Sequence, residues 1–400
     1  MTRSTLLALA TVCVLSASGA VPGVRSASHD AAPLLTRTVV LDGLDAPWDL
    51  AFTPDGAMLV TEKCRGLSVR RADGTWHHLF GHTGAAVVAP DFFCQGQSGA
   101  HGIAVDPDFA RTRLIYLYMP STQARPPTNR VVRLVVDPSY TTVSARIDIV
   151  PDIPFKHAAN AVGGAGLHSG GRLHFGPDGF LYITTGDNHQ PTLPQDLTRL
   201  GGKVLRVDRD GQPAPGNQPP AGGDPRIYTY GHRNIQGLTF RPGTGQPFVA
   251  EHGPNHTDEV TPLIAGGNGG WDPQQRPQLR CPDGYCGYAG DATTMPMTDT
   301  ARFPDAMRPS WTNEGRSEGL GPCTFLTGAP WGAWEGRLAV GFLAGQRVEV
   351  LNLDTAGVTT SHTPLDLPRQ RIRALVPDPT GAIYIAVDAG AIWRVAPPAP

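Results

Sequence analysis

The stretch LHFGPDGFLYITTGD (Leu173–Asp187) decides the fold of this chain. A short apolar run leads into Pro-Asp-Gly, and a second run, Leu181–Thr185, alternates between apolar and polar residues. Proline presets one turn dihedral, aspartate bonds to nearby backbone and glycine accepts a positive φ, so this tripeptide favours a tight turn. Two strand-like runs joined by such a turn predict a β-hairpin.

The same phrase recurs along the chain, as an apolar strand, a turn containing proline, and an alternating strand. Its other copies are LAFTPDGAMLVTE (Leu50–Glu62), IAVDPDFARTRLIYLYM (Ile103–Met119), LTFRPGTGQPFVAEHG (Leu238–Gly253) and LVPDPTGAIYIAVDAG (Leu375–Gly390). The interval from Phe240 to Val376 is about twice the others, which predicts one degenerate unit between them. WEGRLAVGFLAG (Trp334–Gly345) supplies it, with an alternating strand over Leu338–Phe342.

Six units of similar length predict an all-β fold, a six-bladed β-propeller with four strands in each blade. A β-sandwich is the competing all-β architecture, but a sandwich does not repeat one hairpin phrase six times. The composition agrees, because 48 glycines and 39 prolines among 400 residues exclude a mainly helical fold. The 33 Lys and Arg residues nearly balance the 35 Asp and Glu residues, which argues against a nucleic-acid partner.

The amino-terminal residues have the pattern of a signal peptide. Arg3 is followed by the apolar run Leu6–Leu15 and the small residues Ser16–Ala20. This run is too short to span a bilayer, and no other segment is long and apolar enough to do so. We therefore expect a signal peptide over residues 1–28, one propeller domain over residues 29–400 and a secreted or extracytoplasmic protein.

Five cysteines remain once the signal peptide is removed, and an oxidising compartment favours disulfides. Cys281 and Cys286 enclose the turn sequence Pro-Asp-Gly-Tyr, which makes them the first expected pair. Cys64 and Cys94 form the second expected pair and leave Cys323 over. The rival pairing joins Cys323 to one member of the 281/286 loop.

Polar residues concentrate in the loops between the repeated units, which in a propeller gather around the central channel. Gln97 lies in a Gly-rich turn and offers both a donor and an acceptor. His168 lies in a second Gly-rich loop, where an imidazole titrating near neutral pH is suited to act as a general base. A plain turn and a solvated histidine are the structural alternatives.

Two further loops carry dense polar groups. Arg233 and Asn234, in GHRNIQG, suit an anion, a quinone or a polyhydroxy ligand; in a strand they would face opposite ways, whereas in a bend both could face inward. Gly253 and Pro254, in EHGPN, precede Asp258-Glu259, and carbonyl and carboxylate oxygens suit Ca²⁺ better than Zn²⁺.

Taken together and in order, these segments resemble the soluble pyrroloquinoline-quinone-dependent glucose dehydrogenases and aldose sugar dehydrogenases, the glucose/sorbosone dehydrogenase family. The similarity covers roughly Leu44 to Val395. The most specific matches are PWDLAFTPDG, GQSGAHGIAVDPDFA, HSGGRLHFGPDGFLYITTGD, LGGKVLRVDRDG, YGHRNIQGLTF, EHGPNHTDEV and GGNGGW.

The resemblance implies an enzyme that oxidises the anomeric hydroxyl of aldose sugars to a lactone and passes electrons to an external acceptor. It implies a pyrroloquinoline quinone over the channel mouth and a Ca²⁺ on the carbonyls of Gly253 and Pro254. His168 and Arg233 take the catalytic roles: the imidazole accepts the hydroxyl proton and the guanidinium stabilises negative charge on the quinone oxygen. The remaining positions that the family pattern assigns to cofactor binding are Gln97, Asn234, Arg371 and Arg373. Alternation in a strand places Arg371 and Arg373 on one face, and we expect a monomer or a homodimer.

The chain departs from the family pattern at several positions. Ala344 stands where many members carry a cofactor-binding lysine, which predicts a weaker site for a tricarboxylate. Leu167 stands where some members have aspartate, which predicts that His168 lacks a carboxylate to orient it. Gly269 replaces the tyrosine of an Asn-Tyr-Gly-Trp motif, and Ile235 replaces a proline.

Two other functions remain compatible with the sequence. One is a non-catalytic propeller that binds a glycan or a protein, which the changes at Leu167 and Ala344 favour. The other is a Ca²⁺-dependent lactone hydrolase, which needs carboxylates such as Asp187, Asp258 and Glu259 at the channel mouth.

Overall fold

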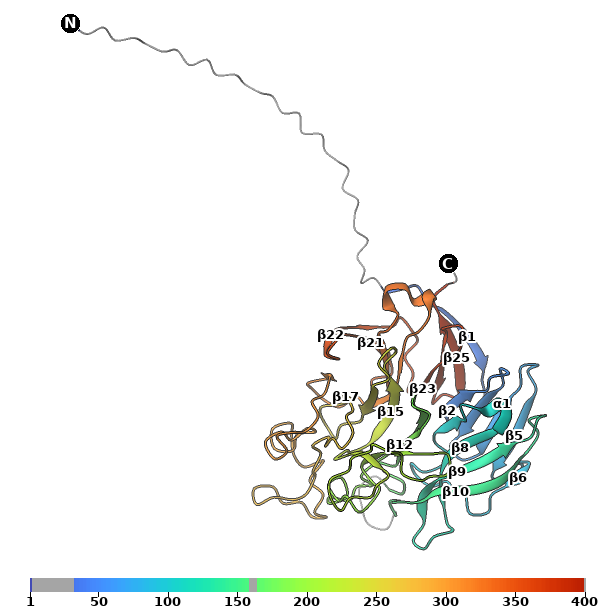
Figure 1. Ribbon diagram of the computed structural model, residues 1–400, viewed down its shortest axis with the longest axis horizontal. Coiled ribbons are helices and arrows are strands. Elements are labelled where there is room, and N and C mark those ends of the chain that lie inside the picture. The colour runs from blue at the N-terminus through green and yellow to red at the C-terminus, as the bar shows by residue number, and fades with distance from the viewer. Residues whose placement is uncertain (2–31, 158–163, 399–400) are drawn as a thin grey trace. The chain divides into compact units, whose positions relative to one another are not determined.

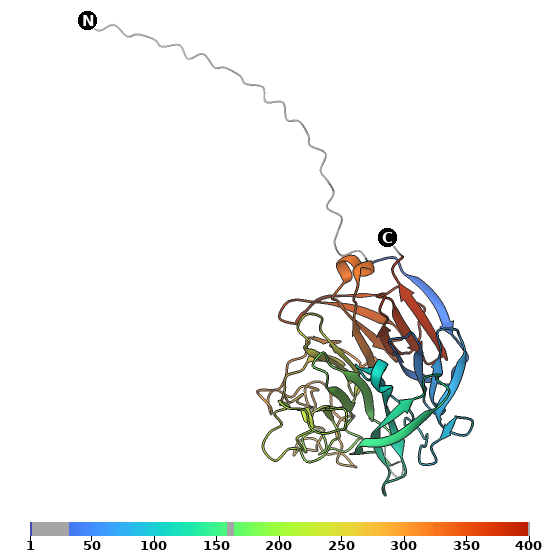
Figure 2. The same ribbon diagram turned by 45° about the vertical axis from the view of Figure 1, so that its right-hand side comes forward.

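The computed structural model describes Met1, residues 32–157 and residues 164–398. Apart from Met1, the expected signal peptide lies outside the described residues. The described chain forms six sheets, which Figures 1 and 2 show fanned around a common centre. Their strands pair antiparallel except for one short parallel pair at the edge of the first sheet. The predicted six-bladed β-propeller is confirmed. None of the described helices has the length and apolar character needed to cross a membrane.

The strands join the sheets in chain order, except that the amino-terminal strand β1 belongs to the last sheet. The first three sheets comprise β2 (Pro47–Phe52), β3 (Met58–Glu62), β4 (Gly66–Arg70), β5 (Trp76–Gly81) and the short β6 (Val87–Val88); β7 (Ile103–Val105), β8 (Leu114–Ser121), β9 (Thr128–Val136) and β10 (Val143–Ile153); and β11 (Gly170–Phe175), β12 (Leu181–Thr185), β13 (Lys203–Val207) and β14 (Ile227–Tyr230). The last three comprise β15 (Ile235–Phe240), β16 (Pro247–Glu251), β17 (Glu259–Pro262) and β18 (Trp311–Thr312); β19 (Leu320–Phe325), β20 (Leu338–Phe342), β21 (Val348–Leu353) and β22 (Thr359–Pro364); and β23 (Ile372–Pro377), β24 (Ile383–Val387), β25 (Ala391–Ala396) and β1 (Thr36–Leu41).

The first strand of each repeated hairpin is the innermost strand of its sheet. Each innermost strand contacts the innermost strand of the next sheet, and β23 contacts β2, so that these strands form a closed ring. The turn of the hairpin is tight and places glycine at a positive φ, as the sequence predicts. In the first unit, Gly56 has a φ of 84°, and its N–H donates to the carbonyl of Thr53 at 2.9 Å.

The core is divided among the interfaces between neighbouring sheets. In β3, Met58 and Val60 pack toward the last sheet with Leu50, whereas Leu59 packs toward the second sheet with Leu117. Successive side chains of a strand point to opposite faces. A hairpin with apolar residues on both faces therefore contributes side chains to the core on each side, against both neighbouring sheets. This is why the strands are buried on both faces and why the units must stack radially.

The chain closes the propeller with its own amino-terminal strand. β1 pairs antiparallel with β25, and Thr38 lies opposite Arg394. Figures 1 and 2 show the blue β1 strand along the red β25 strand. This closure was not predicted, because TRTVVL (Thr36–Leu41) lacks the repeated phrase.

Two units differ from the predicted plain hairpin. The second carries a one-turn helix, α1 (Phe109–Thr112), between β7 and β8, where Phe109 is buried in the core. In the degenerate fifth unit, the 3-10 helix η1 (Ala329–Trp334) lies between β19 and the correctly predicted strand β20. Both disulfides, Cys64–Cys94 and Cys281–Cys286, are confirmed, and Cys323 is buried and free.

Candidate active site

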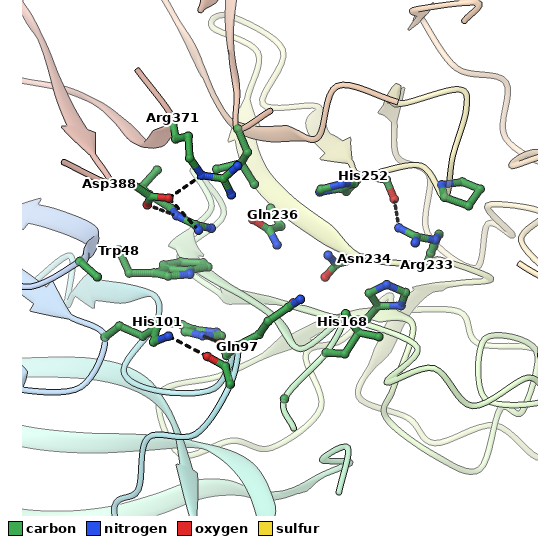
Figure 3. Close-up of a pocket in the computed structure, with 18 of the residues that line it drawn as sticks. Trp48, Gln97, His101, His168, Arg233, Asn234, Gln236, His252, Arg371 and Asp388 are labelled. Carbon is green, nitrogen blue, oxygen red and sulfur yellow. Dashed lines mark hydrogen bonds and ion pairs between the residues drawn. The ribbon is translucent and has the colours of Figure 1, made fainter. Parts of the chain in front are cut away.

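The polar loop segments meet in one cavity of about 560 Å³ at a mouth of the central channel (Figure 3). Its lining includes seven of the eight residues that the sequence and the family resemblance singled out: Gln97, His168, Arg233, Asn234, Pro254, Arg371 and Arg373. The eighth, Gly253, directly precedes Pro254. The geometry therefore brings all the expected site residues to one place.

Hairpin topology explains this convergence. In an antiparallel hairpin, the start of the first strand and the end of the second lie at the same edge. Asn234 and Arg371 directly precede the innermost strands β15 and β23. Lys63, His252 and Asp388 directly follow the second strands β3, β16 and β24. Both sets line the cavity.

His168 lies at the start of the third hairpin in a left-handed conformation, with a φ of 53°. Its Nδ1 lies 2.6 Å from Oδ1 of Asp187, and its Nε2 lies 2.8 Å from the hydroxyl of Tyr288. Burial and the neighbouring Arg233 charge lower the pKa of His168 to about 4. The imidazole is therefore neutral at neutral pH, which leaves it able to accept a proton.

Asp187 orients this imidazole, so the expectation that His168 lacks a carboxylate partner was wrong. The carboxylate follows β12, and its Oδ2 accepts hydrogen bonds from Nε1 of Trp271 at 2.9 Å and the hydroxyl of Tyr285 at 2.8 Å. Burial alone would raise the pKa of Asp187, but the charges and hydrogen bonds of His168, Arg233 and Trp271 hold it below the usual value. Because the ionised carboxylate is only an acceptor, the Nδ1 of His168 carries the proton and Nε2 keeps its lone pair.

Arg233 lies in a bend, and both it and Asn234 line the cavity, as the bend alternative predicts. The guanidinium is almost completely buried. Its Nη1 donates to the carbonyl of His252 at 2.6 Å and its Nη2 to the hydroxyl of Tyr288 at 2.8 Å. Its Nε has no hydrogen-bond partner among the described residues. A buried cation thus lies near the neutral imidazole of His168.

Arg371 and Arg373 supply positive charge to another part of the cavity wall. Both lie on one face of the chain entering β23, as strand alternation predicts, and both bond to Asp388 through Nε, at 2.7 and 2.5 Å respectively. These hydrogen bonds and charges hold the pKa of Asp388 below its usual value although burial raises it. The carboxylate aligns the two guanidinium groups without neutralising both of them.

Lys63 is a further cation in the lining that the sequence analysis missed. Its Nζ donates to the carbonyl of Gly96 at 2.7 Å, and the neighbouring disulfide Cys64–Cys94 ties this turn to the loop that carries Gln97. The lining contains Leu343, next to Ala344, where the family pattern has a lysine. Lys63 therefore adds an ammonium group to the cavity from a different blade.

The expected calcium ligands are backbone carbonyls, and the carbonyl of Gly253 accepts a long hydrogen bond of 3.3 Å from the Ser317 hydroxyl. A Cβ at Gly253 would lie 2.1 Å from the carbonyl oxygen of His256, so only glycine allows this turn to pack so closely. Asp258 does not face a free site, because its oxygens accept from the Gly253 N–H at 2.8 Å, the Ser317 hydroxyl at 2.7 Å and the Glu318 N–H at 2.7 Å. The described residues contain no cluster of three or more His, Cys, Asp or Glu side chains able to hold a metal.

The carboxylates that a lactone hydrolase would need are all engaged elsewhere. Asp187 bonds to His168, Trp271 and Tyr285. Asp258 accepts hydrogen bonds from Gly253 and from the segment over residues 313–318. Glu259 is buried and accepts from Thr298 at 2.8 Å, and burial raises its pKa to about 8. None of the three is left as a free ligand for a water-activating metal.

Comparison with known proteins agrees with this geometry. Residues 44–394 match the family model described as Glucose / Sorbosone dehydrogenase. The chain is 29% identical over 374 residues to the aldose sugar dehydrogenase YliI of Escherichia coli, covering 92% of this chain and 94% of the relative. It is 31% identical over 264 residues to the quinoprotein glucose dehydrogenase B of Acinetobacter calcoaceticus, covering 59% of this chain and 52% of the relative. A solved structure of the PQQ-bound aldose sugar dehydrogenase from Streptomyces coelicolor is 26% identical, with a TM-score of 0.69 over 91% of this chain and 99% of that one.

Proposed function

The chain belongs to the glucose/sorbosone dehydrogenase family of sugar oxidoreductases, and we propose that it oxidises the anomeric hydroxyl of aldose sugars to the lactone. Pyrroloquinoline quinone is the proposed hydride acceptor, and an external acceptor removes the electrons afterwards. The observation that carries this proposal is the neutral His168, held by Asp187 beside the buried Arg233, in a cavity lined by three further cations.

The cavity suits the proposed cofactor in charge and in hydrogen-bonding capacity. Pyrroloquinoline quinone is a flat tricarboxylate, and Lys63, Arg371 and Arg373 offer it three cations against the single carboxylate of Asp388. Nε of Arg233, a donor, and Nδ1 of His252 are buried without a hydrogen-bond partner among the described residues, as expected of polar atoms that face an absent polar ligand. Gln97 and Asn234 are the amides proposed to bind the edges of the ring.

Each protein group has one task in the proposed reaction. When bound, the quinone supplies the two-electron acceptor. His168 accepts the proton of the anomeric hydroxyl at Nε2, and the resulting imidazolium is stabilised by Asp187. Arg233 would donate hydrogen bonds to the quinone oxygen, which gains negative charge when the sugar gives up its hydride. These steps place the acid–base chemistry in the protein and the redox chemistry in the cofactor.

Calcium is the second proposed cofactor. The carbonyl oxygens of Gly253 and Pro254 would hold it, and its role would be to bind and polarise an oxygen of the quinone. Since Asp258 and Glu259 are engaged elsewhere, the remaining ligands would come from the cofactor and from water. This division makes metal binding and cofactor binding interdependent.

We also propose that the protein acts outside the cytoplasm, after removal of residues 1–28. Two disulfides support this, because such bonds persist in oxidising compartments. Determination of the amino-terminal sequence of the mature protein in an exported fraction is the test, and a mature chain that still begins at Met1 contradicts it.

A titration of the apoprotein tests the enzymatic proposal directly. Pyrroloquinoline quinone and Ca²⁺ are added first, then an aldose, and the quinone absorbance and the lactone are followed. The expected result is quinone reduction with stoichiometric lactone in the wild type and almost none in His168→Gln. Glycan binding without quinone reduction, unchanged by His168→Gln, would instead support the non-catalytic alternative.

A further inference from the structure

The hydroxyl of Tyr288 lies between the two groups to which the chemistry is assigned. It is 2.8 Å from Nε2 of His168 and 2.8 Å from Nη2 of Arg233. Tyr288 lines the same cavity and belongs to the long loop between β17 and β18. No described residue other than Tyr288 hydrogen-bonds to Nε2 of His168 in this arrangement.

The direction of each hydrogen bond follows from the ionisation of its partners. Asp187 accepts the proton of Nδ1, so Nε2 of the neutral imidazole is an acceptor, and the Tyr288 O–H donates to it. Arg233 has only donors and therefore donates to the Tyr288 oxygen. One hydroxyl group thus gives its proton to the base and receives a hydrogen bond from the cation.

The proposed reaction requires a sugar hydroxyl to make the first of these two contacts. A substrate O–H must donate to Nε2 of His168 before its proton can be abstracted. The imidazole nitrogen has one lone pair and accepts one such bond. The hydroxyls of Tyr288 and of the sugar therefore exclude each other at this position.

We propose that the Tyr288 hydroxyl is an internal stand-in for the substrate hydroxyl, which the sugar displaces on binding. Tyr288 thereby lowers the affinity of the site for its sugar substrate. This inference rests on the proposed function, because it assigns the displaced position to the reacting hydroxyl of an aldose.

The surroundings of Tyr288 allow its side chain to leave while its backbone stays in place. Asn255 Nδ2 donates to the Tyr288 carbonyl at 3.0 Å, the Ala289 N–H donates to the Cys286 carbonyl at 3.1 Å, and the Cys281–Cys286 disulfide precedes this turn. The side chain is only half-buried, and both of its hydrogen bonds are made by the hydroxyl. Rotation of the side chain about its Cα–Cβ bond would carry the hydroxyl away from His168 without a movement of the loop. This rotation gives up the ring contacts with His189, Tyr285 and Arg233.

The first test needs neither cofactor nor sugar. The ¹⁵N resonance of His168 Nε2 is compared in the apoproteins of the wild type, Tyr288→Phe and Tyr384→Phe, with His168→Gln identifying the signal. Tyr384 lies in β24 outside the cavity and controls for the loss of a phenol. In Tyr288→Phe we expect Nε2 to shift toward the value of an unbonded imidazole nitrogen, whereas Tyr384→Phe matches the wild type. An unchanged Nε2 in Tyr288→Phe overturns the inference.

The second test uses the loaded enzyme with D-glucose, D-galactose and D-xylose. Removing a competitor held by two hydrogen bonds should lower KM about tenfold for the oxidised sugar and leave kcat within about twofold. A tenfold loss of kcat at unchanged KM, or a higher KM, overturns the inference, because the hydroxyl would then take part in the reaction or in binding. If the wild type oxidises no aldose, the proposed function fails and the stand-in role fails with it. A persisting nitrogen shift identifies that outcome as a failure of the function and not of the contact.

Discussion

Nδ1 of His168 lies 2.6 Å from Oδ1 of Asp187, and the two residues flank the two strands of a single hairpin. His168 precedes β11 and Asp187 follows β12, while Gly170 and Thr185 are partners in the strand register. The proposed base and the carboxylate that orients it are therefore positioned by local strand pairing. The Pro-Asp-Gly phrase that specifies the hairpin also specifies this contact.

Asp187→Asn should strongly reduce kcat. The amide can donate to Nδ1, which favours the tautomer with the proton on Nε2 and removes the lone pair that accepts the substrate proton. We expect kcat to fall about 10²- to 10⁴-fold with a smaller change in quinone affinity. Steady-state kinetics with saturating quinone measure this, and Asp210→Asn, an exposed residue paired with Arg133, is the matched control. A kcat within threefold of the wild type contradicts the assigned role of Asp187.

Protein stability should decrease below pH 6.5, and His168 should account for part of the decrease. The folded-state pKa of His168 is lowered from 6.5 to about 4, so the unfolded chain binds more protons between these values and acid favours unfolding. Between pH 7 and pH 5 this group should remove about 1–2 kcal/mol from the free energy of unfolding.

Urea unfolding at the two pH values measures this decrease. His168→Asn should lose less stability on acidification than the wild type. His362→Asn, at a half-exposed histidine on β22, should keep the wild-type dependence. Equal losses in all three proteins would show that His168 is not held neutral by the fold.

The fold and the site differ in how far the sequence predicts them. The hairpins of the first, third, fourth and sixth units lie where the Pro-containing turns place them, because turn chemistry is local. Residues that precede the innermost strands, such as His168 and Asn234, were identified because their loops are rich in glycine and polar groups. Lys63 and Asp388 follow second strands and were missed, although the same edge rule applies to them.

Tyr288 was missed for a different reason, and Trp271 was noted in the GGNGGW match without a role. Both belong to the loop over residues 263–310, which has no strand period and no repeated phrase. Its position depends on contacts with distant residues, such as the hydrogen bond from Trp271 to Asp187 and the buried cluster formed around Cys281 and Cys286. Such contacts leave no local signal in a single sequence.

Lys63→Gln and Arg371→Gln should each weaken binding of the quinone. Each substitution removes one cation from the cavity wall, and we expect about a tenfold higher dissociation constant for each. Fluorescence titration of the apoprotein with pyrroloquinoline quinone measures the change without any turnover. Arg111→Gln, at a highly exposed arginine of α1, controls for the loss of a positive charge. An unchanged affinity in Lys63→Gln would remove Lys63 from the proposed cofactor site.

Calcium binding should depend on the quinone. The proposed protein ligands are neutral carbonyl oxygens, and the neighbouring carboxylate of Asp258 is saturated by Gly253, Ser317, Glu318 and Asn313. Without a charged ligand the apoprotein should bind Ca²⁺ only weakly, with a dissociation constant of about 1 mM or higher. With quinone bound, its anionic oxygens complete the site, and the affinity should rise at least 100-fold. Calorimetric titration with CaCl₂ before and after loading compares the two states. Micromolar binding by the apoprotein would mean that carboxylates elsewhere hold the metal. It would contradict the proposal that the protein supplies only carbonyl ligands and the quinone supplies the anionic ones.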